Sequence, residues 1–252
     1  MSGPGPASPD ATRRTDAWPL ADGEIHYLWW YIQGSIMEPW LRQRLRRAWG
    51  FCGRHAWGAL AVEAAFRHHY LHGPAVLYED LMQQAARGFA RALSRPARPL
   101  ARILRTTASC SMCEEGYERQ GRGAARDELF EQGRDASAFL AFADVTRPHW
   151  RATVCGRCAG NPSTLRCRPH LVEEAPQADR AAVGTHAKLV EHILGHLKAY
   201  VRSFRWECRG SETDEDRAAL ISAVGWCSGW SVWLPLLERR DVVVQGDAPR
   251  RA

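Results

Sequence analysis

Apolar residues recur along most of the chain at the spacing of three and four residues that is typical of amphipathic helices. The longest such pattern runs from Ala181 to Phe204, where Leu189, Ile193 and Leu197 repeat every four residues. Runs of alternating β-branched residues are nearly absent, and DVVVQG near the end is the only obvious strand candidate. The pattern therefore predicts a mainly α fold, with further helices in 24–37, 39–49, 55–70, 74–95 and 214–234.

Several predicted helices carry recognisable boundary residues. Pro39 suits the first turn of a helix, and Gly50 has the position of a glycine just beyond the end of that helix. Thr213 is a suitable N-cap for DEDRAALISAVGWCSGWSVW, whose acidic residues favour the first turn. Three tryptophans recur at helical spacing in this last segment, which favours core packing over a ligand cage: Trp226, Trp230 and Trp233.

The chain contains an internal repeat. FCGRHAWGAL resembles both VCGRCAG and RCRPHLVEEA, and each Cys-x-x-His is predicted to begin a helix. CSMC stands upstream of the later copies, and WPLA stands at a similar distance upstream of the first copy. We therefore predict two related helical halves, 18–109 and 110–240.

Composition is that of a globular protein, because the 252 residues are 45% hydrophobic and 25% charged. Segments 1–17 and 241–252 are predicted to be disordered tails, since the first is rich in Gly, Pro, Ser and Asp and the last resembles it. No apolar run reaches the roughly 18 residues of a membrane span. The start also lacks the apolar core of a secretory signal, so we expect a cytoplasmic protein without a membrane partner.

The formal net charge is +6, and Lys188 and Lys198 are the only lysines. Two basic stretches, LRQRLRRAWG and RALSRPARPLARILR, have the charge to contact phosphates. We interpret them as solvated faces of helices. A protein partner or a small ligand is therefore expected in preference to a nucleic acid.

Eight cysteines in a cytoplasmic chain indicate metal ligands or buried thiols more often than disulfides. Their grouping favours a metal, because C-x-x-C and C-x-x-H pairs each present two ligands to one ion. The second half contains three such pairs and so six candidate ligands, which we expect to form a zinc-knuckle-type site: Cys110, Cys113, Cys155, Cys158, Cys167 and His170.

A structural zinc site needs four of these six ligands. One set joins the two C-x-x-C pairs, Cys110/Cys113 and Cys155/Cys158. Another closes locally between Cys155/Cys158 and Cys167/His170, and all six together would hold two ions if sulfurs bridged or water completed a shell. Zn²⁺ is the leading ion, and an iron–sulfur cluster is the alternative, because four of these cysteines suffice for one.

The motifs GFCGRHAW, CSMC and CRPHL, together with YVRSFRW, resemble an uncharacterised prokaryotic family of helical, presumed zinc-binding proteins with tandem CPxC…G[FL]CxxH repeats. The resemblance covers most of 18–233 and implies a ligand set of Cys110, Cys113, Cys167 and His170. Trp18 and Ala21 stand where the first C-x-x-C of the family would lie, which leaves the first half with a degenerate metal motif. The resemblance implies a fold and a metal, and no activity.

Other cysteines and histidines are weaker candidates for metal ligands. Without evident partners, Cys52 and His55 are interpreted as residues of a helix start. His192 and His196 are interpreted as a polar pair at the edge of the apolar stripe, although histidines four residues apart can share a metal. The remaining residues are interpreted as core positions: His186, Cys208 and Cys227.

Three functions are compatible with these residues. The first is a helical binding or regulatory module with a structural zinc in its second half. The second is a metalloenzyme that acts on a small molecule at an open zinc or iron site, and the third is a thiol-based redox sensor that uses two surplus sulfurs. No catalytic motif identifies an enzyme, and catalytic residues remain unassigned.

Overall fold

The computed structural model describes residues 18–32, 34, 38–66, 71–94, 99–121 and 125–237. No strand occurs among these residues, and the predicted mainly α class is confirmed. The predicted tails and the candidate strand DVVVQG lie outside the described residues. The α-helices are α1 (Asp22–Ile32), α2 (Pro39–Ala48), α3 (Gly53–Ala65), α4 (His72–Leu93), α5 (Leu100–Leu104), α6 (Ser111–Glu115), α7 (Asp127–Gly133), α8 (Ser137–Val145), α9 (Arg147–Trp150), α10 (Gly156–Ala159), α11 (Arg168–Glu174), α12 (Arg180–Ser203) and α13 (Asp214–Ser228).

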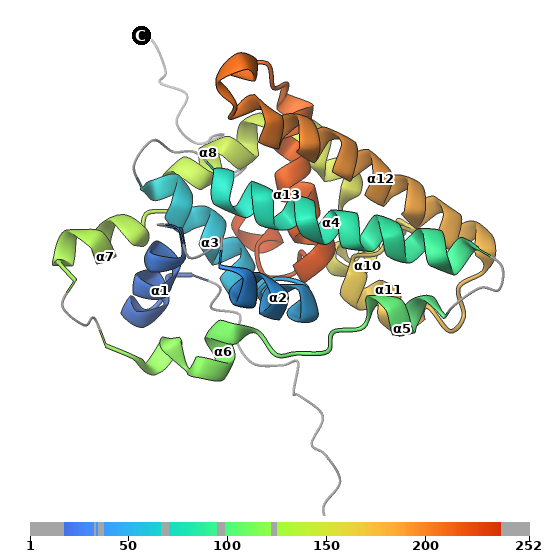
Figure 1. Ribbon diagram of the computed structural model, residues 1–252, viewed down its shortest axis with the longest axis horizontal. Coiled ribbons are helices and arrows are strands. Elements are labelled where there is room, and N and C mark those ends of the chain that lie inside the picture. Colours follow the sequence, from blue (N-terminus) through green and yellow to red (C-terminus); the bar gives the residue numbers. More distant parts are fainter. Residues whose placement is uncertain are drawn as a thin grey trace, which may run out of the picture.

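Helix α13 is the central element of the fold. It packs against the two longest helices, α4 and α12, which also pack along each other across the molecule (Figure 1). It also contacts α3, and α3 in turn packs against α1, α7 and α8. The short helix α11 contacts both α13 and α5. Long helices therefore build the frame, and short helices are attached to it.

The boundary residues of several helices act as predicted. Pro39 is the first residue of α2, whose end is closed by Trp49 and Gly50 in the left-handed region, with φ of 60° and 91°. The Gly50 amide donates to the Leu45 carbonyl at 2.8 Å. Thr213 caps α13 through a capping box with Asp216, so local sequence determines where this helix begins.

The predicted continuation of α13 through Trp233 is wrong. The helix ends at Ser228 because Gly229 takes φ of 90°, and the following residues turn back onto the helix. Trp230 then packs so closely against Gly225 that a Cβ on this glycine would overlap the indole ring. The prediction that the three tryptophans are core residues is confirmed, since all of them are buried.

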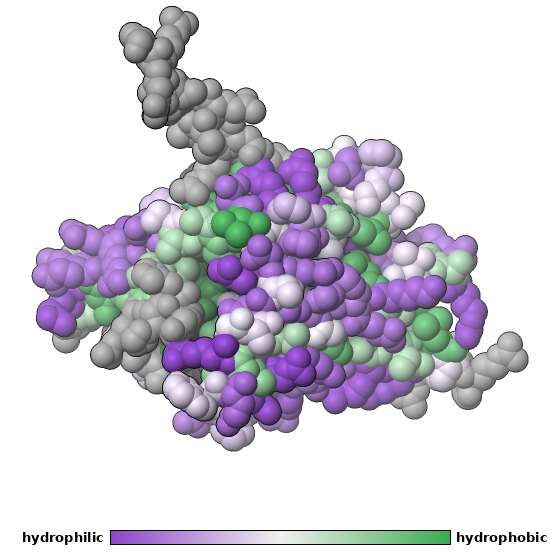
Figure 2. All heavy atoms as spheres, turned by 90° about the horizontal axis from the view of Figure 1, so that it is seen from above, coloured by the Kyte–Doolittle hydropathy of each residue, from purple (hydrophilic) through white to green (hydrophobic). Residues whose placement is uncertain are grey.

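The predicted boundary between the two halves, at 109 and 110, falls between α5 and α6. Helix α3 of the first half packs against α7 and α8 of the second. Aromatic side chains from both sides share one core: the Trp57 ring lies 5.7 Å from the Trp230 ring and 6.2 Å from the Phe139 ring. The surface seen in Figure 2 is mostly hydrophilic with smaller hydrophobic areas, as expected when most large apolar side chains are buried.

Replacing Gly225 with alanine tests the packing of the returning segment. We expect Gly225→Ala to lower the free energy of unfolding by about 1–3 kcal/mol, because the added methyl group overpacks the Trp230 site. Gly184→Ala in α12 is the matched control, since a Cβ there meets no atom within 4 Å. It should raise stability by about 0.5–1 kcal/mol. Equal effects in chemical denaturation would contradict the packing described.

Candidate metal centres

Four side chains from two separate helix starts form the first candidate metal centre. Cys52 is the N-cap of α3 and His55 lies in its first turn, while Cys110 is the N-cap of α6 and Cys113 lies on that helix. The His55 Nδ1 atom is 3.2 Å from the Cys52 Sγ atom, 3.4 Å from that of Cys110 and 3.5 Å from that of Cys113. We call this group site 1.

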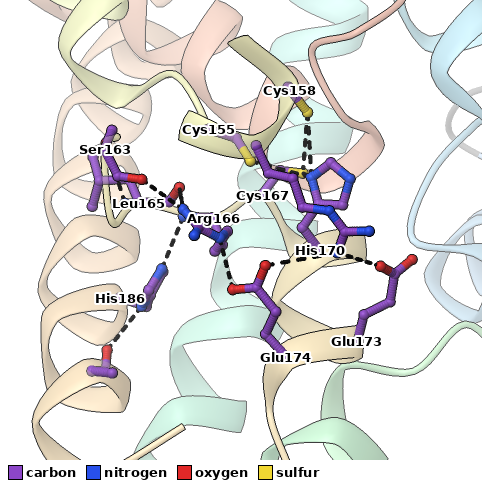
Figure 3. A network of polar contacts seen from close by, with 12 residues as sticks. Cys155, Cys158, Ser163, Leu165, Arg166, Cys167, His170, Glu173, Glu174 and His186 are labelled. Carbon is purple, nitrogen blue, oxygen red and sulfur yellow. Dashed lines mark hydrogen bonds and ion pairs between the residues drawn. The ribbon is translucent and has the colours of Figure 1, made fainter. Parts of the chain in front are cut away.

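The second candidate centre, site 2, contains Cys155, Cys158, Cys167 and His170 (Figure 3). Cys155 is the N-cap of α10 and Cys167 is the N-cap of α11. The His170 Nδ1 atom lies 3.2, 3.5 and 3.3 Å from the sulfurs of Cys155, Cys158 and Cys167. Three thiols and one imidazole nitrogen are thus arranged as in site 1.

These distances fit a tetrahedral zinc ion. With Zn–S bonds of about 2.3 Å and Zn–N bonds of about 2.0–2.1 Å, neighbouring ligand atoms lie about 3.6 Å apart for sulfur and nitrogen and about 3.8 Å apart for two sulfurs. The Cys52 and Cys113 sulfurs are 3.6 Å apart, and those of Cys158 and Cys167 are 3.7 Å apart. A disulfide needs about 2.05 Å, and all eight cysteines are free thiols.

Helix starts favour the thiolate forms that a metal requires. The positive end of the helix dipole and the free backbone amides of the first turn both stabilise a nearby negative charge. Hydrogen bonds from the thiols of Cys158 and Cys167 lower the pKa of Cys155, and backbone amides lower it further. At site 1, hydrogen bonds from Cys113 and Cys52 likewise lower the pKa of Cys110. The N-cap thiols that donate these bonds, Cys52 and Cys167, have a raised pKa, because their hydrogen bonds to neighbouring sulfurs favour the protonated form.

A buried carboxylate orients the histidine of site 1. The His55 Nε2–H group donates to Glu24 at 2.7 Å, which leaves the Nδ1 lone pair facing the three sulfurs. Arg54 donates to both oxygens of Glu24 at 2.8 Å. Burial alone would raise the pKa of Glu24, but the hydrogen bonds from Arg54 and His55 outweigh it and lower the pKa to about 2. The carboxylate therefore stays charged and holds the imidazole in place.

Site 2 is supported by a network of polar contacts, which Figure 3 shows beside it. Arg157, which lies between Cys155 and Cys158 in the sequence, pairs with Glu173 at 2.6 Å and so connects α10 to α11. The backbone amide of Arg166 donates to Nε2 of His186 at 3.0 Å, and Nδ1 of His186 donates to the Ala182 carbonyl at 2.8 Å. His186 is buried, so its prediction as a hydrogen-bonded core histidine is confirmed, and it holds the loop before Cys167.

The segment 227–233, which contains the end of α13 and the residues just beyond it, lies next to both sites. On the side of site 1, the Ser228 hydroxyl donates to the carbonyl of Phe51, the residue before Cys52, at 3.0 Å. On the side of site 2, the Trp230 backbone donates a hydrogen bond to Cys158, although the contact with Cys155 and burial outweigh it and raise the pKa of Cys158. The two centres are therefore linked through one buried piece of chain.

Arg168 adds a second connection on the side of site 2. It directly follows the ligand Cys167, and its guanidinium is buried without a carboxylate partner. It donates to the Cys227 carbonyl at 2.9 Å and to the Leu104 carbonyl at 3.0 Å, at the ends of α13 and α5. The position of site 2 is thus coupled to the ends of two other helices.

The structure brings together one of the ligand sets considered from the sequence, the local set of Cys155, Cys158, Cys167 and His170. Cys110 and Cys113 join neither the Cys155/Cys158 pair nor the Cys167/His170 pair. Their partners are instead Cys52 and His55, which sequence reasoning had left as residues of a helix start. The missed signal was the C-x-x-H spacing itself, because Cys52-x-x-His55 repeats the arrangement of the second half.

A third group, outside the cysteine clusters, joins α12 to the first turn of α13. It contains His192, His196 and Glu215, whose ligand atoms lie within 4.8 Å of one another. The interpretation of the two histidines as a polar edge pair therefore omitted a carboxylate from another helix.

Comparisons with known protein families, with curated proteins and with solved structures find no match for this chain. Among the helices that the structure describes, none is long and apolar enough to cross a membrane.

Replacing one ligand of site 1 tests whether Cys110 binds a metal. We expect Cys110→Ser to lower the metal content by one ion per chain, because three remaining ligands bind zinc much more weakly than four. Cys208→Ser is the control, since Cys208 belongs to neither group. Elemental analysis of both variants checks the expectation, and an unchanged metal content in Cys110→Ser would contradict it.

Glu24→Gln tests the orienting contact without removing a ligand. We expect the affinity of site 1 for Zn²⁺ to fall by about 10–100-fold, because the histidine loses its charged hydrogen-bond partner. Glu173→Gln is the matched control at site 2, since this carboxylate pairs with Arg157 at the surface and leaves His170 untouched. Competition with a chromophoric chelator measures the Zn²⁺ affinity of both variants. The same affinity in Glu24→Gln as in the unmodified protein would contradict this role.

Proposed function

We propose that this protein is a cytoplasmic zinc protein that binds one Zn²⁺ ion at each Cys₃His site and uses both ions mainly to stabilise its fold. On this proposal it acts as a binding or regulatory module. The observation that carries the proposal is that each group supplies four ligands with tetrahedral spacing, as closed structural zinc sites do.

The ligand types favour zinc over an iron–sulfur cluster. Clusters are usually held by four cysteine thiolates, whereas each group here contains three cysteines and a histidine. Six of the eight cysteines are divided between the two groups, so the two sulfurs that the redox-sensor hypothesis treated as surplus each have a place in a four-ligand group. The free thiols also favour a reducing compartment such as the cytoplasm.

The length of the ligand-bearing helices supports a structural role for the metals. Helices α6, α10 and α11 contain 5, 4 and 7 residues. Isolated helices shorter than about 12–15 residues are marginal in water, so these need an external restraint. Structural zinc binds zinc-finger peptides with about 10–16 kcal/mol at neutral pH, which is comparable to the whole stability of a typical domain.

Surface residues favour a protein partner over a nucleic acid. The positive charge of the predicted basic stretch LRQRLRRAWG is partly neutralised, because Arg44 pairs with Glu114 at 2.7 Å and Arg46 pairs with Asp80 at 2.6 Å. Trp206 is 81% exposed and Trp40 is 57% exposed. Large exposed aromatic side chains are typical of the residues that anchor protein–protein contacts.

Metal analysis and chelation test the proposal together. Protein purified without added metal should contain two zinc ions per chain and no visible absorption from iron. Removing both ions with a strong chelator should abolish the cooperative thermal transition or lower its midpoint by at least about 10 °C, because several kcal/mol of stabilisation is lost. Re-addition of Zn²⁺ to a reduced sample should restore the transition. A metal-free protein with an unchanged melting curve would contradict the structural role.

A further inference from the structure

Three side chains from two helices converge at the junction of α12 and α13, away from any cysteine ligand. His192 and His196 lie one turn apart on α12, and Glu215 lies in the first turn of α13. The Glu215 Oε1 atom is 3.5 Å from Nε2 of His192 and 3.5 Å from Nε2 of His196. One carboxylate oxygen thus faces two imidazole nitrogens at the same distance.

This distance suits a shared ion better than direct hydrogen bonds. An N–H···O hydrogen bond has a usual length of 2.7–3.2 Å. Ligands at about 2.0–2.2 Å from a tetrahedral zinc ion lie about 3.4 Å from one another. Both oxygen–nitrogen separations are therefore those of neighbours in one coordination shell, and all three ligand atoms lie within 4.8 Å of one another.

The orientation of His196 is fixed by a further contact. Its Nδ1–H group donates to the Asp216 Oδ1 atom at 2.8 Å, so its Nε2 lone pair faces Glu215. Asp216 is itself held in place, because its other oxygen accepts from the backbone amide and the hydroxyl of Thr213, both at 2.9 Å. The capping box of α13 therefore positions His196 on α12.

The three side chains are accessible to solvent. The side chains of His192, Glu215 and His196 are 53%, 42% and 30% exposed. They line a small hollow of about 20 Å³, room for about one water molecule, together with His149, Thr153 and Ser222. The Thr153 hydroxyl lies 2.9 Å from that of Ser222 and 2.8 Å from the Trp150 carbonyl, so these neighbours form a hydrogen-bonded polar wall beside the three side chains.

We propose that His192, His196 and Glu215 form a third zinc site, in which the remaining coordination position is left to water or to a small anionic ligand. Two histidines and one carboxylate with an open position are the ligand set of zinc sites that activate water or polarise a bound oxygen. The site is independent of the structural zinc ions in its residues and in its ligand chemistry.

Calorimetric titration of Zn²⁺ into protein that already carries its two tightly bound ions tests this proposal. We expect one further Zn²⁺ per chain in the unmodified protein, with an affinity at least about tenfold lower in His196→Ala and in Glu215→Gln. Glu191→Gln is the matched control, because this exposed acid lies on the same helix outside the group. No third equivalent, or equal binding by His196→Ala, would overturn the proposal and leave an ion-pair cluster only.

Cobalt(II) tests the open position. Co²⁺ in the third site should show visible bands without the thiolate charge-transfer absorption of cysteine sites, and these bands should shift when azide is added. Bands that azide leaves unchanged would contradict an open position. The metal count before titration is read separately, so a failure of the two cysteine sites is distinguishable from a failure of this one.

Discussion

The structure depends on the convergence of four helix starts on two Cys₃His groups. Each ligand pair begins at an N-cap cysteine, in α3, α6, α10 and α11. These helix starts supply backbone amides and a positive dipole end to thiolates that would otherwise repel one another. The segment 227–233 contacts Cys158 of one group through the Trp230 backbone and, through Ser228, the residue before Cys52 of the other. The metal centres and the tryptophan core are therefore parts of one arrangement.

The two centres differ in what surrounds their histidines. His55 is held by the buried pair of Glu24 and Arg54, so the orientation of the imidazole at site 1 is determined by a charged contact inside the core. At site 2 the ion pairs lie nearer the surface, and the buried cation beside the ligand Cys167 is Arg168, which donates to helix-end carbonyls. Identical ligand sets are thus coupled to different parts of the fold.

Local sequence predicted much of the fold and only part of the candidate sites. Pro39 and the Thr213 capping box determine helix starts through contacts within a few residues, and the local set of site 2 spans a short stretch of chain. Site 1 was missed because Cys52 and Cys110 are far apart in sequence, and only the packed frame brings them together. The predicted end of α13 was wrong for a related reason. Trp230 packs back onto Gly225, and helical periodicity in the sequence does not reveal such a tertiary contact.

Zinc X-ray absorption spectroscopy of protein carrying only its tightly bound metal tests the central claim most directly. The account predicts an average first shell of about three sulfurs at about 2.3 Å and one nitrogen at about 2.0–2.1 Å per zinc, because both sites have the ligand set Cys₃His. An average shell of four sulfurs would require sulfurs that bridge two ions or cysteines outside the two groups, and one of two sulfurs with two light atoms would mean that two of the six cysteines bind no zinc. Either result would contradict the two-site arrangement.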